Sequence, residues 1–144
     1  MRRVSFLVIA GLLVIGKFLP ASADTMDWTS ADQFDDAMWP YRVERGMQPR
    51  DLAVRVVNGN PEYKIVWQAY EGGFSDAIFP TQSRAEAEGL IRAYADPEDA
   101  HIPGGDPKLC LHKFARARDG DQEYFLLYMV DPDQGMRCIS LPKQ

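Results

Sequence analysis

Residues 124–130 read YFLLYMV, and their only polar groups are two tyrosine hydroxyls. A strand with one face in water alternates apolar and polar residues, whereas this run is apolar on both faces. Both faces must therefore be covered, one by a helix and the other by some other part of the chain. We expect this run to be the central strand of a sheet.

A hairpin signal lies nearer the N-terminus. Alternating apolar positions predict one strand through Leu52, Val54 and Val56, and a second from Tyr63 to Ala69. The four residues between them, Asn58-Gly59-Asn60-Pro61, include types that tolerate the positive φ of a tight turn. The two strands should therefore pair antiparallel.

A short helix is expected before this hairpin. Thr29 or Ser30 would cap it, and Pro40 would end it. In this interpretation Phe34, Met38 and Trp39 pack against the sheet.

A second helix is indicated after the hairpin. Ser83 and Glu86 have the spacing of a capping box, in which the serine oxygen accepts a first-turn amide. The apolar residues that follow repeat with the period of one helix face, and Asp96-Pro97 ends the pattern: Ala87, Leu90, Ile91 and Tyr94.

Three further strands are predicted, at about 109–118, 123–130 and 136–141, separated by Asp-rich and Gly-containing turns. The sum is an α+β fold with about five strands and two helices in the order α-β-β-α-β-β-β. The sheet should be mainly antiparallel.

The N-terminal residues have the features of an export signal. Arg2 and Arg3 precede an apolar run of about 13 residues, and Ala21-Ser22-Ala23 fits a signal peptidase site. The run is shorter than the roughly 20 residues needed to cross a bilayer, so a stable membrane anchor is not expected. We predict a cleaved signal peptide at 1–23 and a single exported domain at 24–144, in the periplasm or outside the cell.

Charge limits the choice of partners. Cleavage would remove three basic residues and no acid, which changes the formal net charge from −5 to −8. Binding to nucleic acid or to anionic lipid depends on Lys and Arg neutralising phosphate, so neither is expected. A basic protein or a cation is electrostatically favoured.

Cys110 and Cys138 are an even pair in a chain expected to be exported, which favours a disulfide. A plain meander of the last three strands would place these cysteines two strands apart, too far for a bond. Three arrangements remain: the last strand lies elsewhere, Cys110 lies in a loop that folds over, or the thiols are free. We prefer a last strand or terminal segment that returns beside the strand at 109–118.

Catalytic and metal sites are not indicated. His101, Cys110 and His112 lack the ligand spacings of structural zinc sites, and an oxidised cysteine cannot act as a thiolate ligand. The acidic segments 119–123 and 131–135 read as turns, because neither completes a calcium-binding loop. No catalytic residue, metal or cofactor is predicted.

The aromatic-rich stretch WQAYEGGFSDAIFP suggests a contact surface for another protein, because aromatic residues are enriched at interfaces. The leading hypothesis is a protein-binding module of the bacterial cell envelope: an accessory subunit, inhibitor or immunity-type protein. Its partner contacts would be Trp67, Tyr70, Phe74 and Phe79. The alternatives are a small periplasmic hydrolase that uses His112 or His101 with an acid, and a small-molecule or cation carrier.

Overall fold

The computed structural model describes residues 24–70, 75–96 and 108–144. Within these ranges the fold is α+β, as predicted, but its strands form two antiparallel sheets of three strands each. Sheet A has the order β1-β3-β2, with bounds Asp24–Ser30, Asn60–Ala69 and Met47–Val57. Sheet B has the order β4-β6-β5, with bounds Asp76–Thr81, Gln122–Val130 and Cys110–Asp119.

Two helical regions accompany the sheets. The first is continuous in space and consists of the 3₁₀ turn η1 (Ala31–Gln33), helix α1 (Phe34–Trp39) and the π-helical turn η2 (Pro40–Glu44). The second is helix α2 (Arg84–Ala95). A further 3₁₀ turn, η3 (Pro132–Gln134), follows β6. In the described residues no helix combines the length and apolar character required to cross a membrane.

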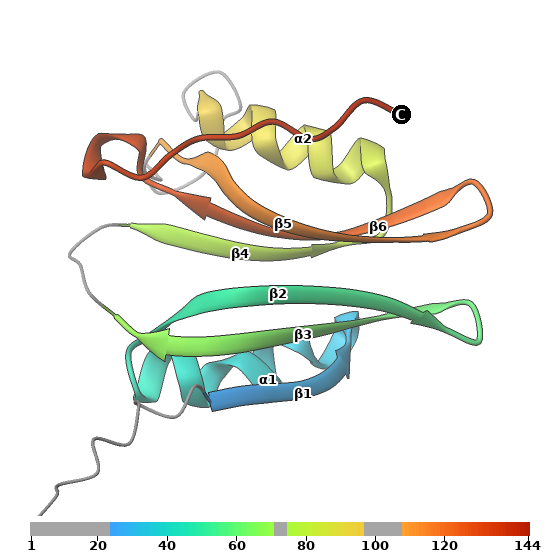
Figure 1. Cartoon of the computed structure of the whole chain (residues 1–144), viewed down its shortest axis with the longest axis horizontal. Coiled ribbons are helices and arrows are strands. Elements are labelled where there is room, and N and C mark those ends of the chain that lie inside the picture. Colours follow the sequence, from blue (N-terminus) through green and yellow to red (C-terminus); the bar gives the residue numbers. More distant parts are fainter. Residues whose placement is uncertain (1–23, 71–74, 97–107) are drawn as a thin grey trace, which may run out of the picture.

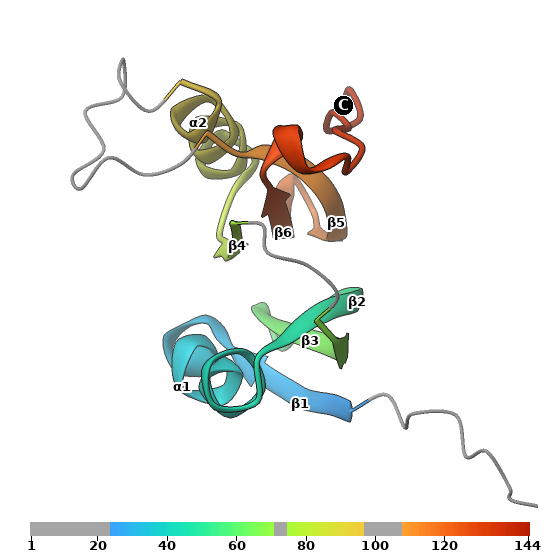
Figure 2. The ribbon, with the colours of Figure 1, turned by 90° about the vertical axis from the view of Figure 1, so that its left-hand side faces the viewer.

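The elements form layers (Figure 1). Helix α2 covers the outer face of sheet B, and the inner face of sheet B lies over sheet A. Strand β2 approaches β5, so the two sheets are closest along that side (Figure 2). On the other side Phe34 and Met38 of α1 join the core between the sheets.

Strand β6 lies at the centre of sheet B, and residues 123–130 are all buried. Its alternate side chains Leu126, Tyr128 and Val130 belong to the core between the sheets. The intervening Phe125, Leu127 and Met129 pack against α2. The prediction of a central strand covered on both faces is thus confirmed.

The predicted hairpin is formed by β2 and β3. Asn58 and Gly59 connect the strands with φ values of 52° and 78°. A two-residue turn with positive φ at both positions matches the twist of the flanking strands, and Asn-Gly is well suited to it. Leu52 pairs with Ile65 and Val54 with Tyr63, as the alternation implies.

The number and order of strands differ from the prediction. Strand β1 occupies the residues just before the first helix, and β4 lies in a stretch for which no strand was predicted. Both are short edge strands, and Pro80 in β4 is tolerated because an edge strand need not donate every amide. Segment 136–141 is not a regular strand.

The first helical region does not end at Pro40. Its backbone remains helical through Glu44, and the hydrogen bonding changes from α to π at the proline. Proline has no N–H, so a shift in hydrogen-bond pattern at this position accommodates the missing donor. Phe34, Ala37, Met38 and Tyr41 all pack against the core between the sheets.

Candidate functional site

The predicted disulfide between Cys110 and Cys138 is present, with the two Cα atoms 5.6 Å apart. It joins the start of β5 to the C-terminal segment. The amide of Ile139 also donates a 2.7 Å hydrogen bond to the carbonyl of Leu111. The terminal segment therefore returns beside the third of the predicted strands, as expected, although without regular pairing.

His112 lies next to this disulfide, at an irregularity in the pairing of β5 with β6. Its Nδ1 atom is 2.8 Å from the carbonyl oxygen of Arg137, so Nδ1 is the donor and must carry a proton. The ring also meets the ring of Tyr128 edge-on, with centroids 5.9 Å apart. No hydrogen bond or ion pair joins His112 to a carboxylate within the described ranges, and His101 lies outside them.

The two acidic turns adopt the conformations expected of turns. Asp131 Oδ1 accepts the amide of Asp133 at 2.8 Å, and Gly120 and Gly135 have φ values of 59° and 78°. Among the described residues no group of three or more His, Cys, Asp or Glu side chains is arranged to hold a metal ion.

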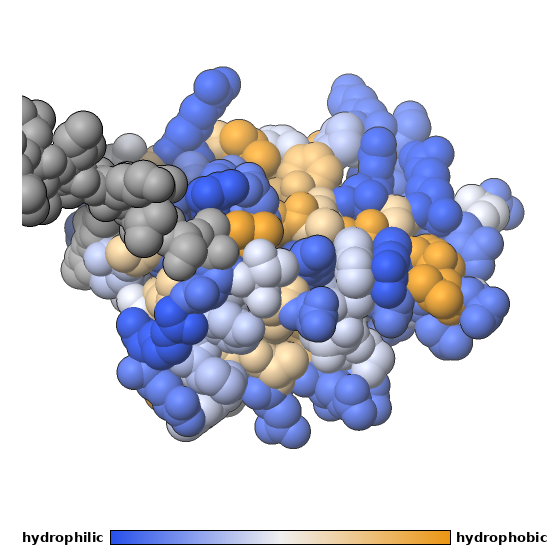
Figure 3. Space-filling model, turned by 60° about the horizontal axis from the view of Figure 1, so that its bottom comes forward, coloured by the Kyte–Doolittle hydropathy of each residue, from blue (hydrophilic) through white to orange (hydrophobic). Residues whose placement is uncertain are grey.

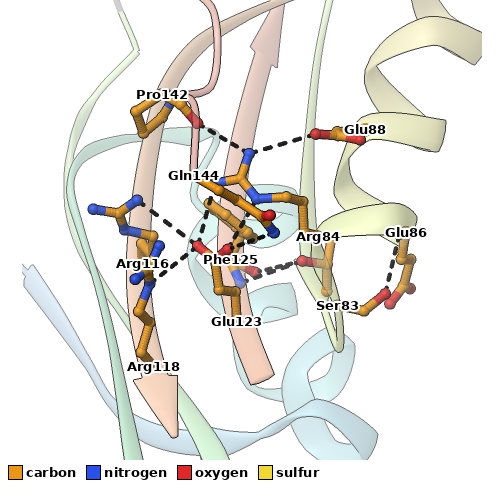
Figure 4. Close-up of polar contacts among 11 residues, drawn as sticks. Ser83, Arg84, Glu86, Glu88, Arg116, Arg118, Glu123, Phe125, Pro142 and Gln144 are labelled. Carbon is orange, nitrogen blue, oxygen red and sulfur yellow. Dashed lines mark hydrogen bonds and ion pairs between the residues drawn. The ribbon is translucent and has the colours of Figure 1, made fainter. Parts of the chain in front are cut away.

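Among the described residues, the most strongly perturbed carboxylate is that of Glu123, which is only 5 % exposed. Figure 4 shows it in contact with Arg84, Arg116 and Arg118. Arg84 from the start of α2 donates to both of its oxygens, at 2.9 and 3.2 Å. Arg116 and Arg118 on β5 lie 3.7 and 3.5 Å away. The hydrogen bonds from Arg84 outweigh the effect of burial and lower the pKa of Glu123 to about 2.

This cluster joins structural elements and does not form an open site. Arg84 Nη1 donates to the carbonyl of Pro142 at 3.0 Å and lies 3.4 Å from Glu88. Gln144 contributes another contact to Glu123 at 3.4 Å. Each nitrogen of the Arg84 guanidinium group is thus engaged, and the cluster fastens the C-terminal residues to α2 and β6.

Of the four aromatic residues predicted to contact a partner, Trp67 is completely buried. It belongs to the core between the sheets, where the ring of Tyr41 stacks on it at 5.5 Å. This corrects the expectation for Trp67, because a side chain with no exposed area cannot meet a partner.

The other three aromatic residues differ in position. Phe79 is half-buried and packs against Tyr94, with ring centroids 5.1 Å apart. Tyr70 is 37 % exposed and directly follows the last residue of β3. Phe74 lies outside the described residues.

A different apolar pair is more exposed. Trp39 is 55 % exposed and Val43 is 53 % exposed, and the two residues are four apart on the first helical region. This corrects the expectation that Trp39 packs on the sheet. The exposure of Trp39 could have been predicted from the sequence. The residues Phe34, Ala37, Met38 and Tyr41 repeat with the period of one helix face, and Trp39 falls outside that face.

Acidic side chains precede this pair along the helix. Asp35 and Asp36 precede Trp39 by four and three residues, and Asp32 lies a turn earlier. All three are exposed, and none forms an ion pair with another described residue. We refer to Asp32, Asp35, Asp36, Trp39 and Val43 as the acidic helix face.

The space-filling view of this side of the molecule shows mainly hydrophilic residues, with hydrophobic ones in small separate groups (Figure 3). Residues 24–44 contain six acids and one base, so this segment carries a net charge of −5. Most of the excess negative charge expected for residues 24–144 is thus concentrated in the segment that forms β1 and the first helical region.

The helical region is held firmly on its inner side. Arg42 donates to the Asp76 carboxylate at 2.5 Å and to its backbone carbonyl at 2.7 Å. Tyr128 donates to the same carboxylate at 3.1 Å, and Tyr41 donates to the carbonyl of Thr25 at 3.2 Å. Arg45 pairs with Asp24 at the start of β1. These contacts fix the helix to both sheets while its outer face stays in solvent.

Comparison of the chain with protein-family models, with curated proteins and with solved structures finds no match.

Proposed function

We propose that this protein is a protein-binding module of the cell envelope, an accessory subunit, inhibitor or immunity-type protein, which docks through its acidic helix face. The observation that carries this proposal is the exposure of Trp39 and Val43 on a helix whose other apolar residues are packed. Tryptophan is among the residues most enriched at the energetic centres of interfaces.

Charge specifies the partner. Asp32, Asp35 and Asp36 form no ion pair with another described residue, so a partner that supplies Lys or Arg would gain complementary contacts. The partner surface should present an apolar recess for Trp39, bordered by basic side chains. Nucleic acid is unsuitable because its phosphates would be repelled.

Preorganisation supports the same role. The contacts of Arg42 with Asp76, and of Tyr41 with Trp67 and Thr25, hold the helix in one position. A rigid helix loses little conformational entropy when a partner binds to it. The disulfide is compatible with an oxidising compartment, and the leader expected at residues 1–23 would deliver the protein there.

Site-specific photocrosslinking in the native host tests the proposal. p-Benzoyl-phenylalanine would replace Trp39 or Val43, and the same group at the exposed Asp133 serves as the control. We expect one discrete heterologous adduct from positions 39 and 43 and none from position 133. Mass spectrometry then identifies the captured protein, which should carry a basic surface.

The purified partner allows a quantitative check. Trp39→Ala should weaken binding by at least about tenfold, the effect of losing a central aromatic contact. Asp36→Asn should reduce the salt dependence of the association rate. A Kd unchanged in both Trp39→Ala and Val43→Ala would contradict the proposal, and so would an adduct composed of two copies of this chain.

A further inference from the structure

The last residues of the chain lie as a strap over the outer face of sheet B, and we define this strap as residues 137–144 (Figure 1). Ile139 and Leu141 pack against the apolar cluster between α2 and the sheet. The strap has no regular secondary structure. Among the described residues a single backbone-to-backbone hydrogen bond, from Ile139 to Leu111, joins it to the rest of the molecule. Its position therefore depends on a few separate contacts.

These contacts secure the strap near both of its ends. Near the start, Cys138 forms the disulfide, and the carbonyl of Arg137 accepts a 2.8 Å hydrogen bond from His112 Nδ1. Near the end, the carbonyl of Pro142 accepts a 3.0 Å hydrogen bond from Arg84. Without the disulfide, hydrogen bonds and two apolar side chains alone would hold the strap. A chain end with so few buried contacts opens locally at a small cost in free energy.

The disulfide can be attacked from solvent. Cys138 is exposed, and Cys110 is half-buried at the first residue of an edge strand. A thiol can therefore reach the sulfur of Cys138 while the domain is folded. Exposed disulfides are the more easily reduced ones and include those that regulate proteins.

The two sheets are connected independently of this bond. Strand β5 pairs with β6 along its whole length, and β6 is covered by α2 on one face and by sheet A on the other. The core between the sheets contains no residue of the strap. Reduction should therefore free the strap and leave both sheets folded.

We propose that this disulfide is a redox switch, and that its reduction by a protein dithiol of the thioredoxin type releases the strap from sheet B. A thiolate of the reductant attacks the sulfur of Cys138. The sulfur–sulfur bond breaks, and Cys110 leaves as a thiolate that takes up a proton. The second thiol of the reductant, as its thiolate, then attacks the mixed disulfide and displaces the Cys138 thiolate, which also takes up a proton. The bridge has gained two electrons, and the reductant has become a disulfide.

Release of the strap uncovers an apolar strip on sheet B. Ile139 and Leu141 leave the cluster that contains Leu111, and the carbonyl of Leu111 loses the amide of Ile139. This strip lies on the side of α2, whereas the acidic helix face belongs to the helical region beside sheet A (Figure 2). The switch is thus separate from the proposed function and does not rest on it.

Hydrogen exchange read by nuclear magnetic resonance tests the release. The purified protein would be compared before and after treatment with a phosphine reductant. Exchange of the Ile139 amide should become at least about tenfold faster, because a covalent bond no longer opposes the local opening. Amides of residues 124–130 should keep their protection, which also shows that the reduced protein is folded.

The double variant Cys110→Ser, Cys138→Ser is the matched control, because it lacks the bond and needs no reductant. It should show the exchange pattern of the reduced wild type. The proposal is overturned if Ile139 stays protected in the reduced protein and in the double variant. It is also overturned if residues 124–130 lose their protection, because the bond would then hold the whole domain together.

The kinetics of reduction test whether the folded protein is the species attacked. Reduced thioredoxin serves as the probe, and alkylation followed by mass spectrometry counts the thiols formed. The rate should rise in proportion to the thioredoxin concentration. A rate that is independent of this concentration and equal to the rate of global unfolding would mean that only unfolded chains are reduced, and would overturn the switch.

Discussion

The hydroxyl group of Tyr63 on β3 donates a 2.8 Å hydrogen bond to the carbonyl oxygen of Thr81 at the end of β4, and both residues are completely buried. This bond links sheet A to sheet B through the core. Burial raises the pKa of the Tyr63 hydroxyl well above its ordinary value, so the group stays a neutral donor. Thr81 is anchored further by its own hydroxyl, which lies 3.2 Å from the carbonyl of Phe125.

Removal of the Tyr63 hydroxyl should therefore destabilise the protein. Tyr63→Phe is expected to lower the free energy of unfolding by about 1–2 kcal/mol, because a buried acceptor loses its partner. Urea denaturation measures the change. Tyr41→Phe removes a longer and more exposed bond to Thr25 and should cost less, so equal losses in the two variants would contradict this assignment.

Truncation of Trp67 and truncation of Trp39 should change the free energy of unfolding by very different amounts. Trp67→Ala opens a cavity in the core and is expected to cost about 3–5 kcal/mol. Trp39→Ala removes a largely exposed side chain and should change stability by no more than about 0.5 kcal/mol. The denaturant midpoints of the two variants, compared at an unchanged m-value, measure this difference. A large loss of stability in Trp39→Ala would mean that this side chain contributes to the core.

The disulfide should contribute measurably to stability. It joins residues separated by 28 positions, and closing a loop of this size contributes roughly 3–4 kcal/mol in the chain-entropy model. Cys110→Ser and Cys138→Ser should each lower the thermal midpoint by at least several degrees. A reductant should have the same effect on the wild type and none on either variant. If the wild type and both variants have the same thermal midpoint, the disulfide does not contribute to stability.

The start of α2 depends on Ser83. Its Oγ accepts the amide of Glu86 at 3.1 Å, as the capping pattern predicts, while the Glu86 carboxylate accepts the amide of Gln82, one residue before the cap. Ser83→Ala should cost about 1 kcal/mol in unfolding free energy. Ser83→Asp keeps an acceptor and should restore most of that loss, whereas an unchanged midpoint in Ser83→Ala would show that the cap is dispensable.

Stability in acid should report on Glu123. Its folded-state pKa of about 2 lies below the ordinary value of 4.5, so its ionised form is favoured by folding. The resulting stabilisation is complete above about pH 4.5 and is lost as the pH falls towards 2. Unfolding measured between pH 5 and pH 2 should show a smaller decline in Glu123→Gln than in the wild type. Equal slopes would mean that other carboxylates dominate this range.

The parts of the fold that were predicted correctly have strong local signals. Asn58-Gly59 specifies its turn through the φ values of two residues, and Ser83 specifies a helix start through one hydrogen bond. The apolar run in β6 required cover on both faces, and the structure provides α2 and sheet A. In each case the deciding interaction lies within a few residues or in one strand.

The features that were missed depend on distant contacts. Strand β4 pairs only with β6, across more than 40 residues, and its six residues include a proline. Pro40 suggested the end of a helix, but the contacts of Tyr41 and Arg42 with Trp67 and Asp76 stabilise a further turn. The packing expected of Trp39 was an error of a different kind, because a helix continued to Tyr41 has a local apolar stripe that already leaves Trp39 outside it.

The pairing of β4 with β6 has a consequence for the rate of folding. Strands β2 and β3 meet across a two-residue turn, so their hairpin can form quickly from neighbouring residues. Thr81 pairs with Phe125, which lies 44 residues later in the chain. The conformational entropy of closing this loop is lost before any contact compensates for it. We therefore expect the β2–β3 and β5–β6 hairpins to form early, and the edge strands β1 and β4, whose pairings span long stretches of chain, to be added in the slow, rate-limiting phase of folding.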